Sequence, residues 1–146
     1  MTVKIMKTRP GAIIPRRSTG GAAGMDLCAC IDAPVKLNPG ERRAVPTGLA
    51  IALPDSLSAA FVYARSGLGI KKGVTLSNCV GIIDSDYRGE ICVGLINLSD
   101  TAYEVQPGER IAQMIIAPVA LPELVECDSL EETGRGSGGF GSTGRL

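Results

Sequence analysis

The chain contains no histidine and no tryptophan, and its aromatic residues are three tyrosines and two phenylalanines among 146 residues. The absence of histidine excludes Ser-His-Asp and Cys-His nucleophiles, imidazole acid–base chemistry and histidine-ligated zinc. If the protein is an enzyme, its base is a carboxylate, or a metal ion performs the chemistry. With so few aromatic side chains, the core must be built from aliphatic residues.

Net charge and long hydrophobic runs are also missing. Lys and Arg total 15, Asp and Glu total 15, and the formal charge is zero. This balance argues against nonspecific binding to nucleic acid or to anionic membranes, although a local cationic phosphate pocket remains compatible with it. No stretch approaches the roughly 20 apolar residues that span a bilayer. We therefore expect a cytoplasmic protein without nucleic-acid or membrane partners.

The five cysteines form no CxxC pair, and their odd number leaves one thiol over from any full set of disulfides. A zinc site would need more thiolates at suitable spacing. The better interpretation is that reduced thiols pack as small core residues in the cytosol. The cysteines are Cys28, Cys30, Cys79, Cys92 and Cys127.

Apolar residues occur in short runs separated by turn residues, which is typical of β-strands. We expect strands over residues 49–53, 59–64, 74–76, 91–98 and 111–119. Two similar turn sequences, Asn-Pro-Gly-Glu at 38–41 and Gln-Pro-Gly-Glu at 106–109, precede further runs. No helical periodicity exceeds two turns. The pattern predicts an all-β domain, a β-sandwich or jelly roll.

The composition changes at residue 131. Residues 133–144 contain six glycines and one aromatic residue, too little apolar surface to hold this segment in place. We divide the chain into a body, residues 1–130, and a flexible tail, residues 131–146. The tail contains GxGxxG at 136–141, but a dinucleotide site needs a strand before this motif and a helix after it, so we reject that interpretation.

Five segments place polar residues next to glycines within otherwise aliphatic sequence. They are AGMDL at 23–27, RSGL at 65–68, NCVGIIDSDYRGEI at 78–91, GERIAQ at 108–113 and the glycine tail. Each segment alone is compatible with ordinary turns or solvated strand ends. Together, and in this order, they closely resemble the five motifs of the trimeric deoxyuridine triphosphatase (dUTPase) family, from residue 23 to residue 144.

The resemblance implies an enzyme that hydrolyses dUTP to dUMP and pyrophosphate with Mg²⁺, keeping uracil out of DNA and supplying dUMP for dTMP synthesis. It implies a homotrimer of jelly-roll subunits with active sites between subunits. Asp84 matches the family's catalytic aspartate, which orients and deprotonates the water that attacks the α-phosphorus. Asp26 matches a residue that approaches the magnesium ion through water.

The resemblance also implies the residues that bind substrate. Tyr87 would pack on the deoxyribose and leave no room for a 2′-hydroxyl, and Phe140 would stack on uracil as the tail closes like a lid. The uracil and deoxyribose positions are Asn78, Gly81, Ile82, Ile83, Tyr87 and Phe140. The phosphate positions are Arg65, Ser66, Gly67, Gln113, Arg135, Ser142 and Thr143.

The chain departs from the common family pattern at Ala64, often proline, and at Gly69, often alanine, which affects the stiffness of the loop only. We leave Arg110 out of the catalytic set because it can serve a structural role between subunits. Three alternatives stay open: a catalytically silent trimeric deoxynucleotide-binding regulator, a dCTP deaminase-like enzyme of related fold, and a plain β-sandwich with a disordered linker tail. The intact Asp84 and Tyr87 unit and the Phe140 tail argue against the deaminase.

Overall fold

Short strands dominate the computed structural model, which describes residues 2–140 and 142. Every strand pairing in this part of the chain is antiparallel, as the short turn-bounded apolar runs predict. The elements are β1 (Lys4–Lys7), β2 (Met25–Cys28), β3 (Val35–Leu37), β4 (Arg42–Pro46), β5 (Leu49–Ala52), β6 (Ser58–Tyr63), α1 (Ser66–Lys72), β7 (Val74–Leu76), β8 (Gly81–Ile83), β9 (Cys92–Asn97), β10 (Tyr103–Val105) and β11 (Arg110–Pro118). The expected strands and the all-β class are confirmed.

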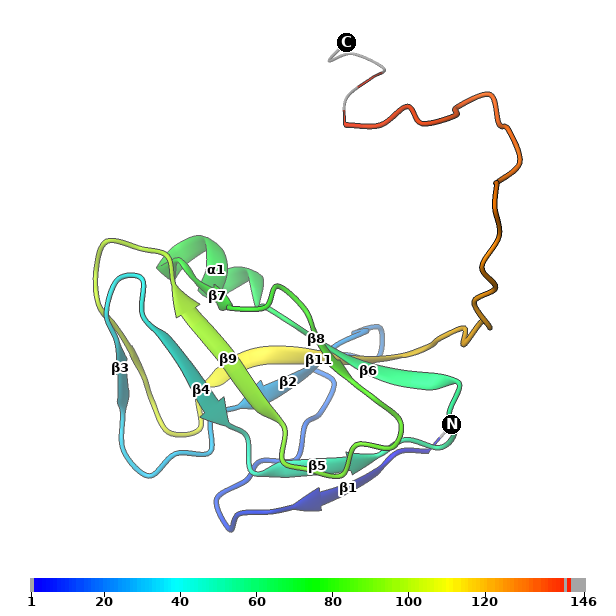
Figure 1. Ribbon diagram of the computed structural model, residues 1–146. Coiled ribbons are helices and arrows are strands. Elements are labelled where there is room, and N and C mark those ends of the chain that lie inside the picture. The colour runs from blue at the N-terminus through cyan, green and yellow to red at the C-terminus, as the bar shows by residue number, and fades with distance from the viewer. Residues whose placement is uncertain (1, 141, 143–146) are drawn as a thin grey trace.

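Two sheets face each other across the core (Figure 1). One has the strand order β2-β11-β6-β8 and the other the order β4-β9-β7. Two-stranded ribbons, β1-β5 and β10-β3, complete the body. The inner strand β11 pairs through its first half with β2 and through its second half with β6, so it is covered by neighbours along its length.

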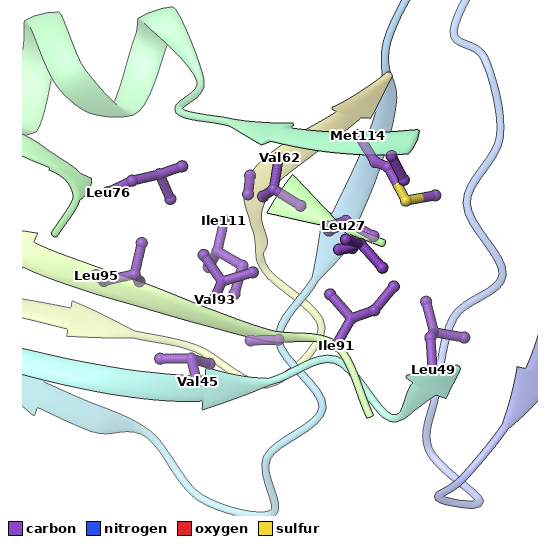
Figure 2. Packing of buried hydrophobic residues seen from close by; sticks show 14 of the residues in the cluster. Leu27, Val45, Leu49, Val62, Leu76, Ile91, Val93, Leu95, Ile111 and Met114 are labelled. Carbon is purple, nitrogen blue, oxygen red and sulfur yellow. The ribbon is translucent and has the colours of Figure 1, made fainter. Parts of the chain in front are cut away.

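The core between the sheets is aliphatic, as the scarcity of aromatic residues predicts. Figure 2 shows Leu27, Val62 and Ile111 from the first sheet lying close to side chains from the second. Val93 and Leu95 approach from β9 and have at most 1% of their surface exposed. They alternate with exposed or half-buried neighbours along that strand, which is the period-2 pattern of a sheet with one buried face.

The two related turns adopt the same conformation. The amide of Glu41 donates to the Asn38 carbonyl oxygen at 2.9 Å, and the amide of Glu109 donates to the Gln106 carbonyl oxygen at 3.1 Å. In both turns the glycine has φ of 75°, the left-handed value that a type II turn requires at its third position. The second turn feeds directly into β11 and thereby fixes where Arg110 begins that strand.

Helix α1 spans seven residues and ends at Gly73, whose φ of 66° suits a left-handed helix terminus. Its short length agrees with the absence of longer helical periodicity in the sequence. No helix in the described part of the chain is long and apolar enough to cross a membrane.

The expectation that the cysteines pack as core residues is wrong for most of them. Cys28 is buried and Cys30 half-buried, whereas the other three are exposed. Strand alternation explains Cys92: it begins β9 on the outer face, and the next residue, Val93, takes the inward position. All five thiols are free.

The segment after β11 leaves the body. Residues 120–137 are exposed, and in Figure 1 this segment runs away from both sheets. After Val119, whose amide donates to the Leu57 carbonyl oxygen at 2.9 Å, the hydrogen bonds of the described residues are local, such as the donation from Gly136 to the Thr133 carbonyl oxygen at 2.9 Å. The described residues of the tail therefore contribute no strand to the sandwich formed by their own chain.

Candidate active site

A cavity of about 230 Å³ opens where β8 and the following loop meet β9. Its walls include Leu76, Val93 and Gly94 from the second sheet and Val62 from the first. Six of the residues expected to recognise the nucleoside or to activate water line it together: Asn78, Gly81, Ile82, Ile83, Asp84 and Tyr87. A single segment supplies them because the chain makes β8 and then turns back within a few residues to enter β9.

The entrance to β8 carries a backbone strain that sequence patterns do not reveal. Cys79 has φ of 62°, and the amide of Val80 donates to the Asn78 carbonyl oxygen at 2.7 Å. This is a tight three-residue turn in which an L side chain occupies the left-handed region. Non-glycine residues held in this way cost about 1–3 kcal/mol and cluster at functional sites. The turn holds the Asn78 side chain at the cavity wall.

Asp84 is the free carboxylate of this cavity. It is exposed, and no hydrogen bond to its carboxylate occurs within the described residues, although its carbonyl oxygen accepts the Tyr87 amide at 3.2 Å. The other carboxylate on the wall, Glu90, accepts hydrogen bonds from Arg9 and from the Gly48 amide. The Arg9 hydrogen bonds and charge hold the pKa of Glu90 below its usual range, with the Gly48 amide contributing in the same direction. Asp84 is therefore the carboxylate with oxygen lone pairs available to a water molecule.

Cys92 also reaches the cavity wall. Desolvation of its sulfur, and then the negative charge of Glu90, raise the pKa of the thiol above its ordinary value. A thiol of this kind stays protonated near neutral pH and is a poor nucleophile. The local electrostatics therefore disfavour covalent cysteine chemistry in this cavity.

Tyr87 is held by its own loop. Its hydroxyl donates to the Glu90 carbonyl oxygen at 3.1 Å. The ring lies across Gly89, where a Cβ atom would be 2.6 Å from Cζ of Tyr87. Arg88 closes the loop by donating to the carbonyl oxygens of Ser85 and Tyr87 at 2.8 and 2.9 Å. The tyrosine is thus half-exposed yet fixed in direction.

A second polar cluster lies toward the opposite edge of the same sheet, where β2 pairs with β11. Asp26 of β2 accepts from Nε of Arg65 at 2.9 Å and from Nη1 of Arg110 at 3.0 Å. Arg65 also donates from Nη1 to the Arg110 carbonyl oxygen at 3.1 Å. Each arginine keeps N–H groups that these bonds do not use, so the cluster can still bind an anion.

Gln113 is adjacent, because in β11 it pairs with Asp26 on one side and Tyr63 on the other. Its amide nitrogen donates to the Ala64 carbonyl oxygen at 2.9 Å. A Cβ at Gly24 would lie 2.7 Å from Gln113 Oε1, so this glycine leaves the space that the amide occupies. The sequence motif AGMDL therefore has a steric reason for its glycine.

Ser66 and Gly67 begin α1 immediately after Arg65. Both are exposed, and a Cβ at Gly67 would meet no atom of this chain within 4 Å. Packing within the chain therefore does not require glycine at this position. The residues expected to bind phosphate thus form one cluster at the end of β6, apart from those of the tail.

The nucleoside cavity and the phosphate cluster do not meet within one chain. Asp26, Arg65 and Gln113 are absent from the cavity wall. Asp26 lies in β2 and Gly81 in β8, with β11 and β6 between them. At ~4.8 Å per strand, three steps across the sheet amount to about 14 Å. One chain therefore presents two half-sites on the same sheet.

The tail residues also lie apart from both half-sites. Arg135 donates from Nε to the Gly138 carbonyl oxygen at 2.9 Å, within the tail itself. Phe140 is fully exposed, with φ of 51°, and the amide of Ser142 donates to the Gly139 carbonyl oxygen at 3.0 Å. Thr143 lies outside the described residues.

The described residues contain no group of three acidic or cysteine side chains that could hold a metal ion. Asp26 uses one lone pair of each oxygen for an arginine, and each oxygen keeps another for a water molecule. This donor set fits a hydrated Mg²⁺ bound mainly by a ligand's own oxygens, and it does not fit a metal site made of protein ligands alone. Arg110 is not among the site residues predicted from the sequence. It reaches Asp26 because β11 pairs with β2.

The dUTPase family model matches residues 11–144 of this chain. The chain is 52% identical over 145 residues to the deoxyuridine 5′-triphosphate nucleotidohydrolase of Thiobacillus denitrificans, covering 99% of each, and 50% identical to that of Burkholderia cenocepacia, covering 99% of this chain and 98% of the relative. Its fold is similar to that of the Staphylococcus bacteriophage 80alpha dUTPase with dUPNHPP, with a TM-score of 0.89, 26% identity and 99% coverage of both chains. Over 90% of this chain and all of that chain, it is also similar to a mutant dUTPase of phage phi11, reported with a structural Mg(II) ion, at a TM-score of 0.81 and 22% identity. This chain belongs to the dUTPase family.

Proposed function

We propose that the protein hydrolyses dUTP to dUMP and pyrophosphate. The observation that carries this proposal is the shared cavity, in which the expected nucleoside-binding residues surround one free carboxylate, Asp84. The 52% identical relative is named for this reaction. The activity removes a precursor of uracil in DNA and supplies dUMP for dTMP synthesis.

Uracil binds in the cavity between Asn78 and β8. The Asn78 amide and the backbone groups of Gly81 and Ile83 supply both donors and acceptors, which can match a pairing edge. A set of buried groups arranged for uracil leaves polar atoms unpaired against cytosine, and this costs binding energy. Exposed Ile82 gives the base an apolar contact.

Tyr87 acts on the sugar. Its ring is fixed across Gly89 and its hydroxyl is engaged by the Glu90 carbonyl oxygen, so the ring cannot easily move aside. A deoxyribose packs against this ring, whereas a 2′-hydroxyl would collide with it. The rigid ring therefore selects deoxyribonucleotides.

The triphosphate binds at the second cluster. Arg65 offers the N–H groups that Asp26 and Arg110 do not use, and Ser66 and Gly67 offer their amides and a hydroxyl at the start of α1. Gln113 adds a side-chain amide beside them. A magnesium ion, when bound, would supply positive charge against the triphosphate. Asp26 would hold that hydrated ion through a water molecule.

Asp84 orients the attacking water and accepts its proton. The water oxygen forms a bond to the α-phosphorus while the bond from that phosphorus to the bridging oxygen breaks, and pyrophosphate leaves with the bonding electrons. Because phosphoryl transfer depends mainly on positioning and charge neutralisation, a carboxylate suffices for this step. No histidine exists in the chain to perform it.

The active sites form between subunits of a homotrimer. Because no residue of the phosphate cluster lines the nucleoside cavity of its own chain, a single dUTP is bound by the nucleoside cavity of one subunit and the phosphate cluster of another. The tail, residues 131–146, then closes as a lid, with Phe140 stacked on uracil and Arg135, Ser142 and Thr143 on the phosphates. The exposure of residues 131–137 is compatible with such docking.

The five free thiols favour a reducing compartment, and we assign the protein to the cytoplasm on this basis. Nothing in its balanced charge favours a nucleic-acid partner.

Pyrophosphate release from dUTP, dCTP, dTTP and UTP with Mg²⁺ tests the proposal. We expect release from dUTP and little from the others. Binding of dUTP without hydrolysis would instead identify a deoxynucleotide-binding regulator, and ammonia release from dCTP would identify a deaminase. Either result would overturn the proposed reaction.

A further inference from the structure

An ion pair between residues far apart in the sequence holds Glu90, a residue of the nucleoside cavity wall. Arg9 donates from Nε to Oε1 of Glu90 at 2.8 Å and from Nη2 to Oε2 at 3.1 Å. The two-point geometry fixes both planar groups, which a single contact would not do. The side chain of Glu90 is 22% exposed and that of Arg9 is 49% exposed. Glu90 lines the cavity, whereas Arg9 does not, so Arg9 acts on the wall only through Glu90.

A third partner comes from the bend between β4 and β5. The amide of Gly48 donates to Oε1 of Glu90 at 2.8 Å, and its carbonyl oxygen accepts the Thr8 amide at 2.8 Å. Gly48 has φ of 69°, and a Cβ there would lie 2.8 Å from Sγ of Cys30. Only glycine fits this bend, so the donor to Glu90 is built into the backbone.

The residue after Glu90 is secured as well. The amide of Ile91 donates to the Leu49 carbonyl oxygen at 2.8 Å, and the Thr47 hydroxyl donates to the Ile91 carbonyl oxygen at 2.7 Å. Thr47 and Ile91 are buried, so these bonds are protected from water. The backbone at Glu90 is therefore held both by its own carboxylate and by its buried neighbour.

The carbonyl oxygen of Glu90 is the acceptor for the Tyr87 hydroxyl, at 3.1 Å. The ring of Tyr87 consequently takes its direction from the position of the Glu90 backbone. Gly89, between them, has no room for a Cβ while the ring stays where it is. A continuous chain of contacts thus joins Arg9 at one end to the exposed ring at the other.

We propose that Arg9 and Glu90, with the Gly48 amide, form a clamp that positions the Tyr87 ring and thereby sets the discrimination between deoxyribose and ribose. This inference rests on the sugar-selecting role of Tyr87 under the proposed function and extends it to Glu90 in the cavity wall and to Arg9 outside the cavity. Arg9 lies outside all five segments that carry the family resemblance. Glu90 and Arg9 are positioning residues, because they reach the substrate only through Tyr87.

The charge state of Glu90 agrees with this role. The hydrogen bonds and charge of Arg9 lower the pKa of the Glu90 carboxyl, and the same pair raises the pKa of Arg9. The carboxylate is therefore ionised at neutral pH and accepts three hydrogen bonds, two from Arg9 and one from the Gly48 amide. These bonds hold it in place, and its lowered pKa makes it a weak proton acceptor.

Arg9→Met tests the clamp because methionine keeps the unbranched stem and removes the charged fork. Arg43→Met is the matched control, since Arg43 forms a comparable surface pair with Glu41 at 2.7 Å and lies away from the cavity. The kcat and KM for dUTP and UTP are measured for each variant. We expect the ratio of kcat/KM for dUTP over UTP to fall about 3- to 10-fold in Arg9→Met, mainly through KM, and to stay unchanged in Arg43→Met.

A spectroscopic readout separates positioning from mere stability. The chain has three tyrosines, so protein labelled with 3-fluorotyrosine gives three ¹⁹F resonances, which Tyr87→Phe assigns. We expect Arg9→Met to shift or broaden the Tyr87 resonance, Arg9→Lys to restore it in part and Arg43→Met to leave it unchanged. If Arg9→Met yields too little folded protein, Glu90→Gln gives the same comparison with side-chain shape retained.

Tyr87→Ala separates the sugar-selecting role of Tyr87 from the positioning of its ring by Arg9 and Glu90. If Tyr87→Ala loses selectivity while Arg9→Met and Glu90→Gln keep both the selectivity and the Tyr87 resonance of the control, the clamp is refuted and the sugar gate stands. If Tyr87→Ala itself keeps full selectivity, the gate fails and the inference fails with it. If Arg9→Met lowers the thermal midpoint without changing selectivity, the Arg9–Glu90 pair contributes only to stability and the proposed clamp is refuted.

Discussion

Replacing Arg65 by lysine tests whether the second cluster binds phosphate. Arg65 donates to the Asp26 carboxylate from Nε and to the Arg110 carbonyl oxygen from Nη1, which leaves its remaining N–H groups for a ligand. Lysine keeps the positive charge but has a single nitrogen at the end of its stem. It can replace one of the two contacts, and it cannot hold Asp26 and a phosphate in the same fixed geometry.

The effect on stability follows from these contacts. A hydrogen bond to a charged partner contributes about 1.5–3 kcal/mol, and partial exposure reduces this, since 26% of the Arg65 side chain and 20% of that of Asp26 remain accessible. Asp26 keeps its bond to Arg110 in the variant, so no unpaired charge results. We expect the free energy of unfolding to fall by about 1–2 kcal/mol.

The effect on activity is larger. Loss of a preorganised donor at a developing charge typically costs about 10²–10³ in rate. Pyrophosphate release should show that reduction in kcat/KM for dUTP, and urea unfolding should show the small loss of stability. Asp26→Asn completes a double-mutant cycle, in which we expect a coupling energy of about 1 kcal/mol between the two positions. If Arg65→Lys loses stability but keeps the wild-type kcat/KM, Arg65 does not bind phosphate and serves only as a structural partner of Asp26.

Three further predictions concern other parts of the chain. Removing residues 131–146 should lower kcat/KM for dUTP by about 10²-fold, because a lost base–aromatic stack alone costs about 1–3 kcal/mol. The thermal midpoint should stay unchanged, and full activity of the truncated protein would refute the role of the tail as a lid. Folding lowers the pKa of Glu90, so the stabilisation from its ionised form is present above the unfolded pKa near 4.5 and is lost as pH falls through the lower folded value. Calorimetry from pH 6 to 3 should therefore show a smaller loss of unfolding free energy in Arg9→Met than in wild type. Equal losses in the two proteins would contradict the pairing. Cys79→Val should destabilise by about 1–2 kcal/mol, because a β-branched residue resists φ of 62°, whereas Cys79→Gly should not; equal effects would argue against strain there.

Most of the fold could be predicted from the period of the apolar residues. The alternation around β9 places Val93 and Leu95 inward, and both are buried. Three residues hardly display a period: of the three-residue strands, β7 was predicted, whereas β3, β8 and β10 were not. The prediction that the cysteines are buried failed because their exposure depends on strand register, which composition does not determine.

The candidate site was predictable where its residues are consecutive. Asn78, Asp84 and Tyr87 share one segment, and that segment builds one cavity. Contacts between distant segments were not predictable: no sequence pattern links Asp26 to Arg110, or Arg9 to Glu90, because strand pairing and the Gly48 bend bring them together. The left-handed Cys79 was equally hidden, since that residue type does not indicate a positive φ.

Asp84→Asn tests the central claim most directly. The substitution keeps the size of the side chain, and because the carboxylate is exposed and accepts no hydrogen bond within the described residues, stability should not change. Loss of a positioned base typically costs about 10²–10⁴ in rate. We predict that pyrophosphate release from dUTP falls by this factor while dUTP still binds and the thermal midpoint stays at the wild-type value. Turnover at the wild-type rate in Asp84→Asn would contradict the account.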